Sequence, residues 1–258
     1  MAIRVKKHVP SGTIILDRPQ RKNALTRQML EDLQQALTDL HQERKVRAVI
    51  LTGAGDCFSS GIDLTEMNET RQSGDSLQQW YDEVVLFRDV LELMLRYPKP
   101  IVAAVSGPAL GAGAALLLAC DVVVAASDAT FGLPEARRGL VAGLAAPLLA
   151  FRVGGGWSAN LLMTGEVLSA EKAQRIGVFH EVVTSNVVWA RAQQMCEMIS
   201  ESAPEALQMT RRLVNETIGE ALFTALSSGA AATATARTTE AAAEGLTAFH
   251  DKRLPQWP

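Results

Sequence analysis

The longest uncharged stretch of the chain runs from Pro100 to Cys120, twenty-one residues without Asp, Glu, Lys or Arg. A transmembrane helix needs roughly 18 or more apolar residues, so the length alone would allow one. The tripeptide Ser-Gly-Pro at 106–108 interrupts the stretch, however, and two further glycines follow. We therefore expect no membrane span here but a sequence of four elements: a strand (101–105), a turn (106–110), a helix (111–119) and a second strand (121–126).

Both faces of these expected strands are apolar, which is typical of an α/β fold whose sheet is covered on both sides. Earlier segments continue the alternation of strands and helices. We expect strands at 12–19 and 46–53, a helix at 26–44 capped by Thr26, and a long helix at 75–98. After about residue 140 the pattern becomes mostly helical. There we expect short helices at 144–154, 156–165 and 169–177 (capped by Ser169), a strand at 178–183, helices at 186–200 and 204–218, and packed helices in the tail 221–252.

Composition excludes several classes of protein. The 258 residues are 48% hydrophobic and 21% charged, as in ordinary soluble globular proteins. A net charge of −3 gives no large basic field for nucleic acid. Cys57, Cys120 and Cys196 are widely spaced and match no zinc signature, so we expect reduced thiols, no metal and a cytoplasmic location. The first ten residues lack the apolar core of a secretory signal.

Glycine-rich segments and serines offer weak alternatives. Segment 53–58 lacks the third glycine of a dinucleotide fingerprint, and 107–113 has neither this fingerprint nor the Lys-Ser/Thr of a P-loop. Segment 153–157 opens a helix with no strand directly before it. Ser106 is not in a G-x-S-x-G turn, as a hydrolase nucleophile would be. The four histidines are scattered along the chain and suggest neither a base nor a metal site.

Two strand-to-helix turns form a stronger candidate site. The segments 57–64 and 109–116 each turn through glycine, which allows a ligand to approach the backbone closely. The first N–H groups of a helix have no partner within the helix. Two such N–H groups aimed at one oxygen would form an oxyanion hole, in which each donor is worth ~3 kcal/mol of transition-state stabilisation. The alternative is two tight turns with no catalytic role.

Five segments resemble successive landmarks of the crotonase superfamily, the enoyl-CoA hydratase/isomerase family. They are TIILDRPQRKNAL, VILTGAGDCFSSGIDL, KPIVAAVSGPALGAGAALLLACDVVVAASDATFGLPE, LMTGEVLSAEKAQRIGVFHEVV and EGLTAFHDKRLPQW, and they span about residues 3–257. The resemblance implies a β-β-α spiral core with coenzyme A and acyl pockets in residues 1–195. It implies a C-terminal helical oligomerisation region in 196–258, and a homotrimer or a dimer of trimers.

The resemblance also implies a set of site residues. The oxyanion donors map onto the backbone N–H groups of Ile62 and Ala112, where relatives commonly have Gly; Ala requires the turn to avoid positive φ at this position. Phe249 and Lys252 match positions that reach the coenzyme A of a neighbouring subunit. The remaining residues expected to contact substrate or coenzyme A are Lys22, Ala24, Leu25, Ser60, Gly61, Asp63, Leu64, Ala109, Leu110 and Gly111. The acyl-CoA thioester is the substrate, and no cofactor is implied.

One charge expected of a hydratase is missing. Hydratases of the family use two glutamates, and the first of these positions is Ala115 here. The second is present as Glu135, whose alternative is an exposed acid paired with Arg137 or Arg138. A single carboxylate in an apolar pocket can move a proton between the α and γ carbons of an enoyl thioester, and its pKa should be raised. We therefore expect an isomerase-type enzyme in which Glu135 is the catalytic residue.

Other functions stay open. A hydratase would be possible if Glu66 or Glu69 reached into the site. A thioester hydrolase or a decarboxylase would use the same oxyanion hole. The protein could also bind acyl-CoA without turnover or serve as a structural oligomer. The segment 139–154 departs from the run that relatives often carry, which leaves the acyl chain length open.

Overall fold

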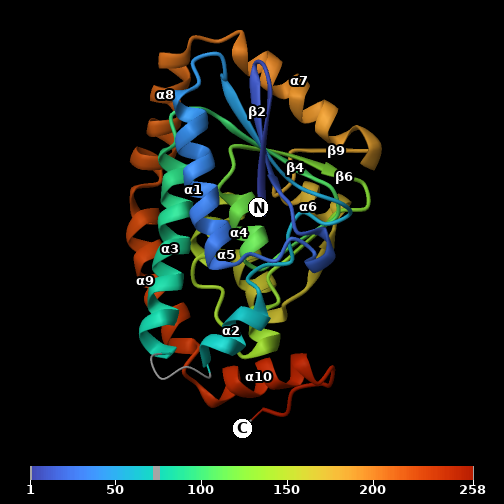
Figure 1. Cartoon of the computed structure of the whole chain (residues 1–258), viewed down its shortest axis with the longest axis vertical. Helices are drawn as coiled ribbons and strands as arrows, with labels where there is room; N and C mark the ends of the chain where they lie inside the picture. Colours follow the sequence, from blue (N-terminus) through green and yellow to red (C-terminus); the bar gives the residue numbers. More distant parts are fainter. Residues whose placement is uncertain (1, 72–75, 258) are drawn as a thin grey trace.

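The computed structural model describes residues 2–71 and 76–257, so Asp75, the first residue of one predicted helix, lies outside the described part. Its centre is a six-stranded sheet in the order β1-β2-β3-β4-β6-β9 (Figure 1). The strands β1 and β2 pair antiparallel, and all other neighbours are parallel. Their bounds are β1 (Ile3–His8), β2 (Ser11–Leu16), β3 (Ala48–Gly53), β4 (Ile101–Val105), β6 (Val122–Ala126) and β9 (Glu181–Val183).

A second, three-stranded sheet carries the order β5-β7-β8. Its strands are β5 (Pro108–Leu110), β7 (Thr130–Gly132) and β8 (Val167–Ser169). The α-helices are α1 (Arg27–Gln42), α2 (Leu64–Arg71), α3 (Ser76–Arg96), α4 (Ala112–Leu118), α5 (Ala145–Thr164), α6 (Ala170–Arg175), α7 (Val188–Ser200), α8 (Pro204–Arg212), α9 (Glu220–Ala236) and α10 (Glu240–His250). Short 3₁₀ turns are η1 (Pro19–Arg21), η2 (Glu135–Arg138) and η3 (Ser185–Val187), and η4 (Leu213–Ile218) is a π-helical continuation of α8.

The uncharged stretch forms the strands β4 and β5 and the helix α4. Every residue of β4 is buried, and so are the residues of α4 from Gly113 to Leu118. The absence of charge therefore reflects a position inside the fold, with β4 between β3 and β6. Within the described residues, no helix is long and apolar enough to cross a membrane.

Helices cover the sheet on both sides, which confirms the α/β fold class. In Figure 1, α1 lies on one side of the sheet and α7 on the other, with α3 and α9 beside α1. The helix α7 packs on β3, β4 and β6, while α3 packs on α1 and α9. Because both faces are covered, the parallel strands carry apolar residues on both sides.

Several predicted boundaries need correction. The strand β1 was not predicted, since five of its six residues are exposed at the sheet edge and it lacks an apolar pattern. The segment 106–110 contains a short strand instead of being wholly a turn. The two predicted helices at 144–154 and 156–165 form one element, α5, with a break at Gly154, whose φ is 79°. Thr26 and Ser169 cap α1 and α6 as predicted.

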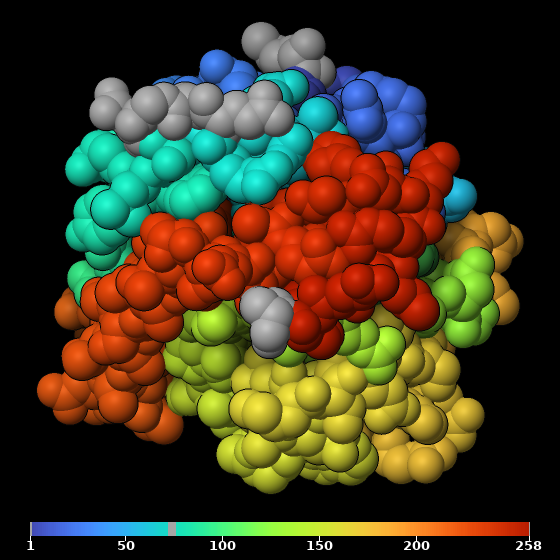
Figure 2. Space-filling model, turned by 90° about the horizontal axis from the view of Figure 1, so that it is seen from below, coloured from blue at the N-terminus to red at the C-terminus, as the bar shows by residue number. Residues whose placement is uncertain are grey.

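The C-terminal helices contact the rest of the chain in two places. The helix α9 packs on α3 and α5, and α10 packs on η2. Seen from below, α10 (red) lies across one face of the molecule, with α2 and the start of α3 (teal) on one side (Figure 2). As predicted for a packed tail, Leu222, Leu226 and Leu246 are buried.

Candidate active site

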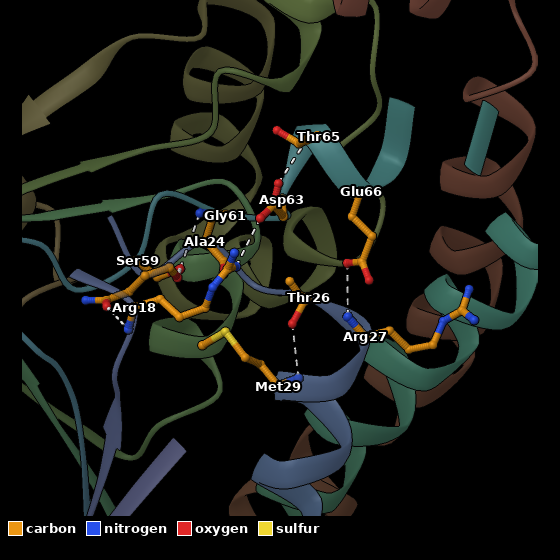
Figure 3. Close-up of polar contacts among 11 residues, drawn as sticks. Arg18, Ala24, Thr26, Arg27, Met29, Ser59, Gly61, Asp63, Thr65 and Glu66 are labelled. Carbon is orange, nitrogen blue, oxygen red and sulfur yellow. Dashed lines mark hydrogen bonds and ion pairs between the residues drawn. The ribbon is translucent and has the colours of Figure 1, made fainter. Parts of the chain in front are cut away.

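Polar contacts tie together two loops, 18–26 and 59–66 (Figure 3). The Arg18 guanidinium donates to the Ala24 carbonyl at 2.6 Å and to the Asp63 carboxylate at 3.0 Å. The other Asp63 oxygen accepts the Thr65 N–H at 3.0 Å and so begins α2. Burial alone would raise the pKa of Asp63, but Arg18 and the Thr65 N–H hold it below its usual value. Asp63 is thus a structural anion that fixes both loops.

A backbone bridge orients the N–H of Ile62. Leu25 and Ile62 form an isolated parallel bridge, in which Leu25 N donates to Gly61 O at 2.8 Å and Asp63 N donates to Leu25 O at 2.9 Å. In a parallel bridge, the residue between the two bonded ones, here Ile62, points its own N–H away from the partner segment. Accordingly, the Ile62 N–H has no hydrogen-bond acceptor among the described residues.

The second turn provides a matching donor. Ala112 is the first residue of α4, and its N–H likewise has no acceptor within the described ranges. The positive φ of the turn, 55°, falls on Gly111, so Ala112 avoids it as its side chain requires. A Cβ on Gly61 would stand only 3.2 Å from the Ala112 nitrogen, which shows how closely the two turns approach.

The close approach of α4 to the backbone at Ser59 depends on Gly113. A Cβ at this position would lie 2.5 Å from the Ser59 carbonyl oxygen, which is closer than any real contact. Ser59 is in turn bridged to Ala109, with Leu110 N donating to Ser59 O at 2.9 Å. The two turns are therefore held side by side by these backbone contacts, together with the contact of Cys57 Sγ to the Pro108 carbonyl at 3.3 Å.

A cavity of about 500 Å³ opens between these turns, η2, α3 and the C-terminal helices. Twelve of the fifteen residues predicted from the sequence line it: Lys22, Ala24, Ser60, Gly61, Ile62, Asp63, Leu64, Leu110, Gly111, Ala112, Glu135 and Phe249. The resemblance implied that Phe249 reaches a neighbouring subunit; in the structure it lines the cavity of its own chain.

The other three predicted residues lie outside the cavity wall. Leu25 and Ala109 are buried behind it, where they form the two backbone bridges. Lys252 is exposed after the end of α10 and has a φ of 54°. Within this single chain, Leu25 and Ala109 thus support the turns, and Lys252 stays apart from the cavity.

Glu135, at the start of η2, brings a carboxyl group to the second turn. The carboxyl lies next to Gly111: a Cβ added to this glycine would be 3.4 Å from Glu135 Oε1. Glu135 Oε2 is shielded from solvent and has no hydrogen-bond partner among the described residues. Neither Arg137 nor Arg138 pairs with it, so the alternative of a surface ion pair is wrong. Burial raises the pKa of Glu135 to about 7, with one backbone N–H opposing the shift.

The position of the missing charge lies in the same wall. Ala115 is buried and lines the cavity, so a methyl group occupies the place where two-glutamate relatives are expected to carry an acid. Glu66, weighed as a substitute, does not line the cavity. Its carboxylate accepts the Arg27 N–H at 3.1 Å, and burial raises its pKa (Figure 3). Glu69 does not line the cavity either.

Four charged residues of the cavity wall were not predicted from the sequence: Arg21, Glu83, Arg138 and Arg237. Glu83 accepts from Arg237 and from Arg27, each at 2.9 Å. Its spacing from Trp80 and Phe87 puts it on the apolar face of α3, a signal that could have revealed it. Its pairing with a residue 154 positions away could not be read from the sequence.

Other reactive groups lie elsewhere. Burial raises the pKa of Cys57 to about 11, which makes its thiol unreactive at neutral pH. The ring of His180 accepts the Val123 N–H at 2.9 Å and so has a structural contact. Within residues 2–71 and 76–257, no three His, Cys, Asp or Glu side chains are grouped to hold a metal ion. The expectation that neither a metal nor a cofactor is needed stays a prediction.

Known proteins are similar to this chain in sequence and in fold. Residues 11–258 match the family described as enoyl-CoA hydratase/isomerase. A protein named putative enoyl-CoA hydratase, from Thermus thermophilus, is 35% identical over 98% of each chain. Among solved structures, an enoyl-CoA hydratase/isomerase from Xanthobacter autotrophicus superposes with a TM-score of 0.90 at 30% identity, over 97% of this chain and 94% of its own. A second, from Pseudoalteromonas atlantica, gives 0.87 at 29% identity over the whole of both chains.

Proposed function

The chain belongs to the enoyl-CoA hydratase/isomerase family, and from this premise we propose that it is an enoyl-CoA isomerase in which Glu135 alone moves the proton. One observation carries the proposal. Of the three carboxylates in the cavity wall, Asp63 is bound to Arg18 and Glu83 to two arginines, whereas Glu135 pairs with no cation and its Oε2 has no hydrogen-bond partner among the described residues. A base needs an available oxygen, which Glu135 has.

The reaction follows from the positions of the donors and the base. The thioester oxygen would accept the N–H groups of Ile62 and Ala112, which become stronger donors to it as negative charge develops. Glu135 would take a proton from the α carbon of a 3-enoyl thioester, giving a dienolate whose charge rests on that oxygen. The same carboxyl would return the proton to the γ carbon, which leaves a conjugated 2-enoyl thioester with no net change in atoms.

The raised pKa of Glu135 suits this shuttle. A carboxyl with a pKa of about 7 is a stronger base than an ordinary glutamate and is still half deprotonated at neutral pH. The coenzyme A moiety would lie along Lys22, Ala24 and the 60–64 loop, as the family resemblance implies.

A test replaces the carboxyl with an amide of similar shape. With a 3-enoyl-CoA substrate, Glu135→Gln should lower kcat by about 10²–10⁴-fold, since general acid–base catalysis contributes that much. The rate is followed by the absorbance of the conjugated enoyl thioester. Glu66→Gln is the matched control: it removes a half-buried acid that lies outside the cavity wall, and it should retain turnover. Full turnover by Glu135→Gln would contradict the proposal.

Hydration is the second candidate, because the Thermus thermophilus relative is named a putative enoyl-CoA hydratase. Adding water to a 2-enoyl thioester requires one group to activate water and one to protonate the α carbon. With Ala115 in the wall, Glu135 would have to perform both tasks. Introducing the acid by Ala115→Glu should therefore raise the ratio of hydration to isomerisation, measured as 3-hydroxyacyl-CoA formed from 2-enoyl-CoA.

A further inference from the structure

One charged group of the cavity wall has no use in the fold or in the proposed reaction. Arg138, the last residue of η2, is half-buried and lines the cavity. In the part of the chain that the structure describes, its guanidinium makes no hydrogen bond and no ion pair. A guanidinium carries five N–H donors and stays protonated, so this one awaits an acceptor.

The 3₁₀ turn η2 directs Arg138 into the cavity beside Glu135. Residues three apart in a 3₁₀ helix are eclipsed and are separated by about 6 Å along its axis. Glu135 and Arg138 stand in this relation, and both line the cavity. Arg137 takes the other direction and donates to the Thr164 carbonyl at 3.0 and 2.8 Å.

Packing holds the Arg138 side chain in place. Its guanidinium carbon lies 4.4 Å from the centre of the Phe249 ring, a cation–π contact with α10. The backbone beneath it is fixed as well, since Gly245 of α10 packs directly on the Arg138 carbonyl. A side chain that is already packed on a ring, above a fixed backbone, loses less rotational freedom when it binds a ligand.

Arg138 differs from the other cations of the cavity wall. Arg237 is neutralised by Glu83 at 2.9 Å, and Arg21 and Lys22 are exposed to water. Burial lowers the pKa of Arg138, which reflects the cost of removing its charge from water without a counter-charge. The cavity therefore contains a partly desolvated positive charge whose complement must come from the ligand.

We propose that Arg138 binds a carboxylate at the far end of the acyl group, so that the enzyme acts on thioesters of dicarboxylic acids. The planar guanidinium matches a carboxylate with two parallel hydrogen bonds. This proposal rests on the proposed function in one respect, namely that the reacting carbons lie beside Glu135. The phosphates of coenzyme A are separated from the thioester by the whole pantetheine arm, whereas Arg138 begins one helical turn from Glu135.

The test measures binding of saturated acyl-CoA ligands to the full chain by calorimetry. Dicarboxylic and monocarboxylic acyl-CoA ligands are compared at equal chain length over a series of lengths, with coenzyme A alone as a further ligand. At the best length, the dicarboxylic ligand should bind about tenfold to a hundredfold more tightly, the range for a charged hydrogen bond. Arg138→Met should abolish this preference and leave the monocarboxylic affinity unchanged.

Two further variants sharpen the result. Arg137→Met, the neighbouring arginine that points away from the cavity, should keep the full preference. Arg138→Lys should keep part of it, because the charge remains but the two-pronged geometry is lost. Thermal unfolding of each variant checks that it is folded.

Three results would overturn the proposal. The first is equal affinity of the wild type for dicarboxylic and monocarboxylic ligands at every length. The second is an unchanged preference in Arg138→Met. The third is an equal loss of affinity in Arg138→Met for all ligands including coenzyme A, which would assign Arg138 to the coenzyme. Saturated ligands cannot be isomerised, so the outcome is independent of whether Glu135 moves a proton.

Discussion

At the scale of single residues, the carboxyl of Glu135 lies where burial disfavours its charged form, yet the proposed proton transfer requires that form. Its raised pKa makes the rate depend on pH near neutrality. We expect kcat/KM for a 3-enoyl-CoA to rise with pH through a midpoint at about 7 and to level off above it, because only the deprotonated carboxyl removes a proton. A pH–rate profile measures this midpoint. A profile that is already flat from pH 5 upward would contradict the assignment.

The same burial affects stability. Between pH 4.5, the ordinary pKa of a glutamate, and pH 7, near the raised pKa of Glu135, the folded protein holds the Glu135 proton more tightly than the unfolded chain does. Stability is therefore lost as the pH rises through this window. Glu135→Gln removes the charge, so it should be more stable than the wild type at pH 8, by about 1–3 kcal/mol, and similar to it at pH 4. Thermal unfolding at both pH values measures the difference.

Single residues also mark the limit of sequence reasoning. Glu135 and the two N–H donors could be proposed because short, specific motifs surround them. The pair of Glu83 and Arg237 could not be found in this way, since Glu83 is in α3 and Arg237 follows the end of α9, and the two meet only in the folded chain. The pairing of Glu83 with Arg237 decides which carboxylate is available, and no local pattern encodes it.

At the scale of elements, the site depends on how closely α4 packs on the backbone at Ser59. Gly113→Ala should lower stability by about 1–3 kcal/mol, since the added methyl meets a backbone carbonyl that cannot move aside. Turnover should fall too, because the Ala112 N–H begins the same helix.

The matched control is Gly156→Ala, at a position in α5 where a Cβ meets nothing within 4 Å. It should raise stability by about 0.5–1 kcal/mol through helix propensity. The thermal midpoints of both variants, compared with that of the wild type, measure the two effects. If Gly113→Ala were as stable and as active as Gly156→Ala, the close approach of the two turns would not matter.

Elements with a cap or a sustained apolar pattern could be predicted, and the short strands of the second sheet could not. Caps and apolar periodicity located α1 and α6, and the uncharged stretch located β4 and α4. The strands β5, β7 and β8 have three residues each, too few for a period to emerge, and their pairing joins distant segments. These strands border the second turn, so the part of the fold nearest the chemistry was the part least visible in the sequence.

At the scale of the whole molecule, the C-terminal region does more than was expected of an oligomerisation region. Thr233, Arg237 and Phe249 line the cavity from α9 and α10. The proposed division into a core (1–195) and a helical region (196–258) thus separates segments that share one cavity wall. Any change in the packing of α9 or α10 should alter ligand binding.

Assembly remains a prediction that the surface supports. Exposed apolar side chains follow one another along α8 and η4, including Met209, Leu213 and Ile218. We expect light scattering to give three or six times the chain mass of 27.7 kDa. The double variant Leu213→Lys and Ile218→Lys should reduce this mass, because like charges on an apolar interface oppose association. A wild-type mass of one chain would rule out the trimer.

The central claim is that Glu135, with Ala115 and not a second acid in the same cavity wall, favours isomerisation over hydration. The most direct measurement gives the wild-type protein a 3-enoyl-CoA and, separately, a 2-enoyl-CoA, and follows conjugated-enoyl absorbance. We expect a gain of absorbance with the 3-enoyl-CoA and no loss with the 2-enoyl-CoA. Rapid loss with the second, accompanied by 3-hydroxyacyl-CoA, would contradict it, because hydration would then proceed without an acid at position 115.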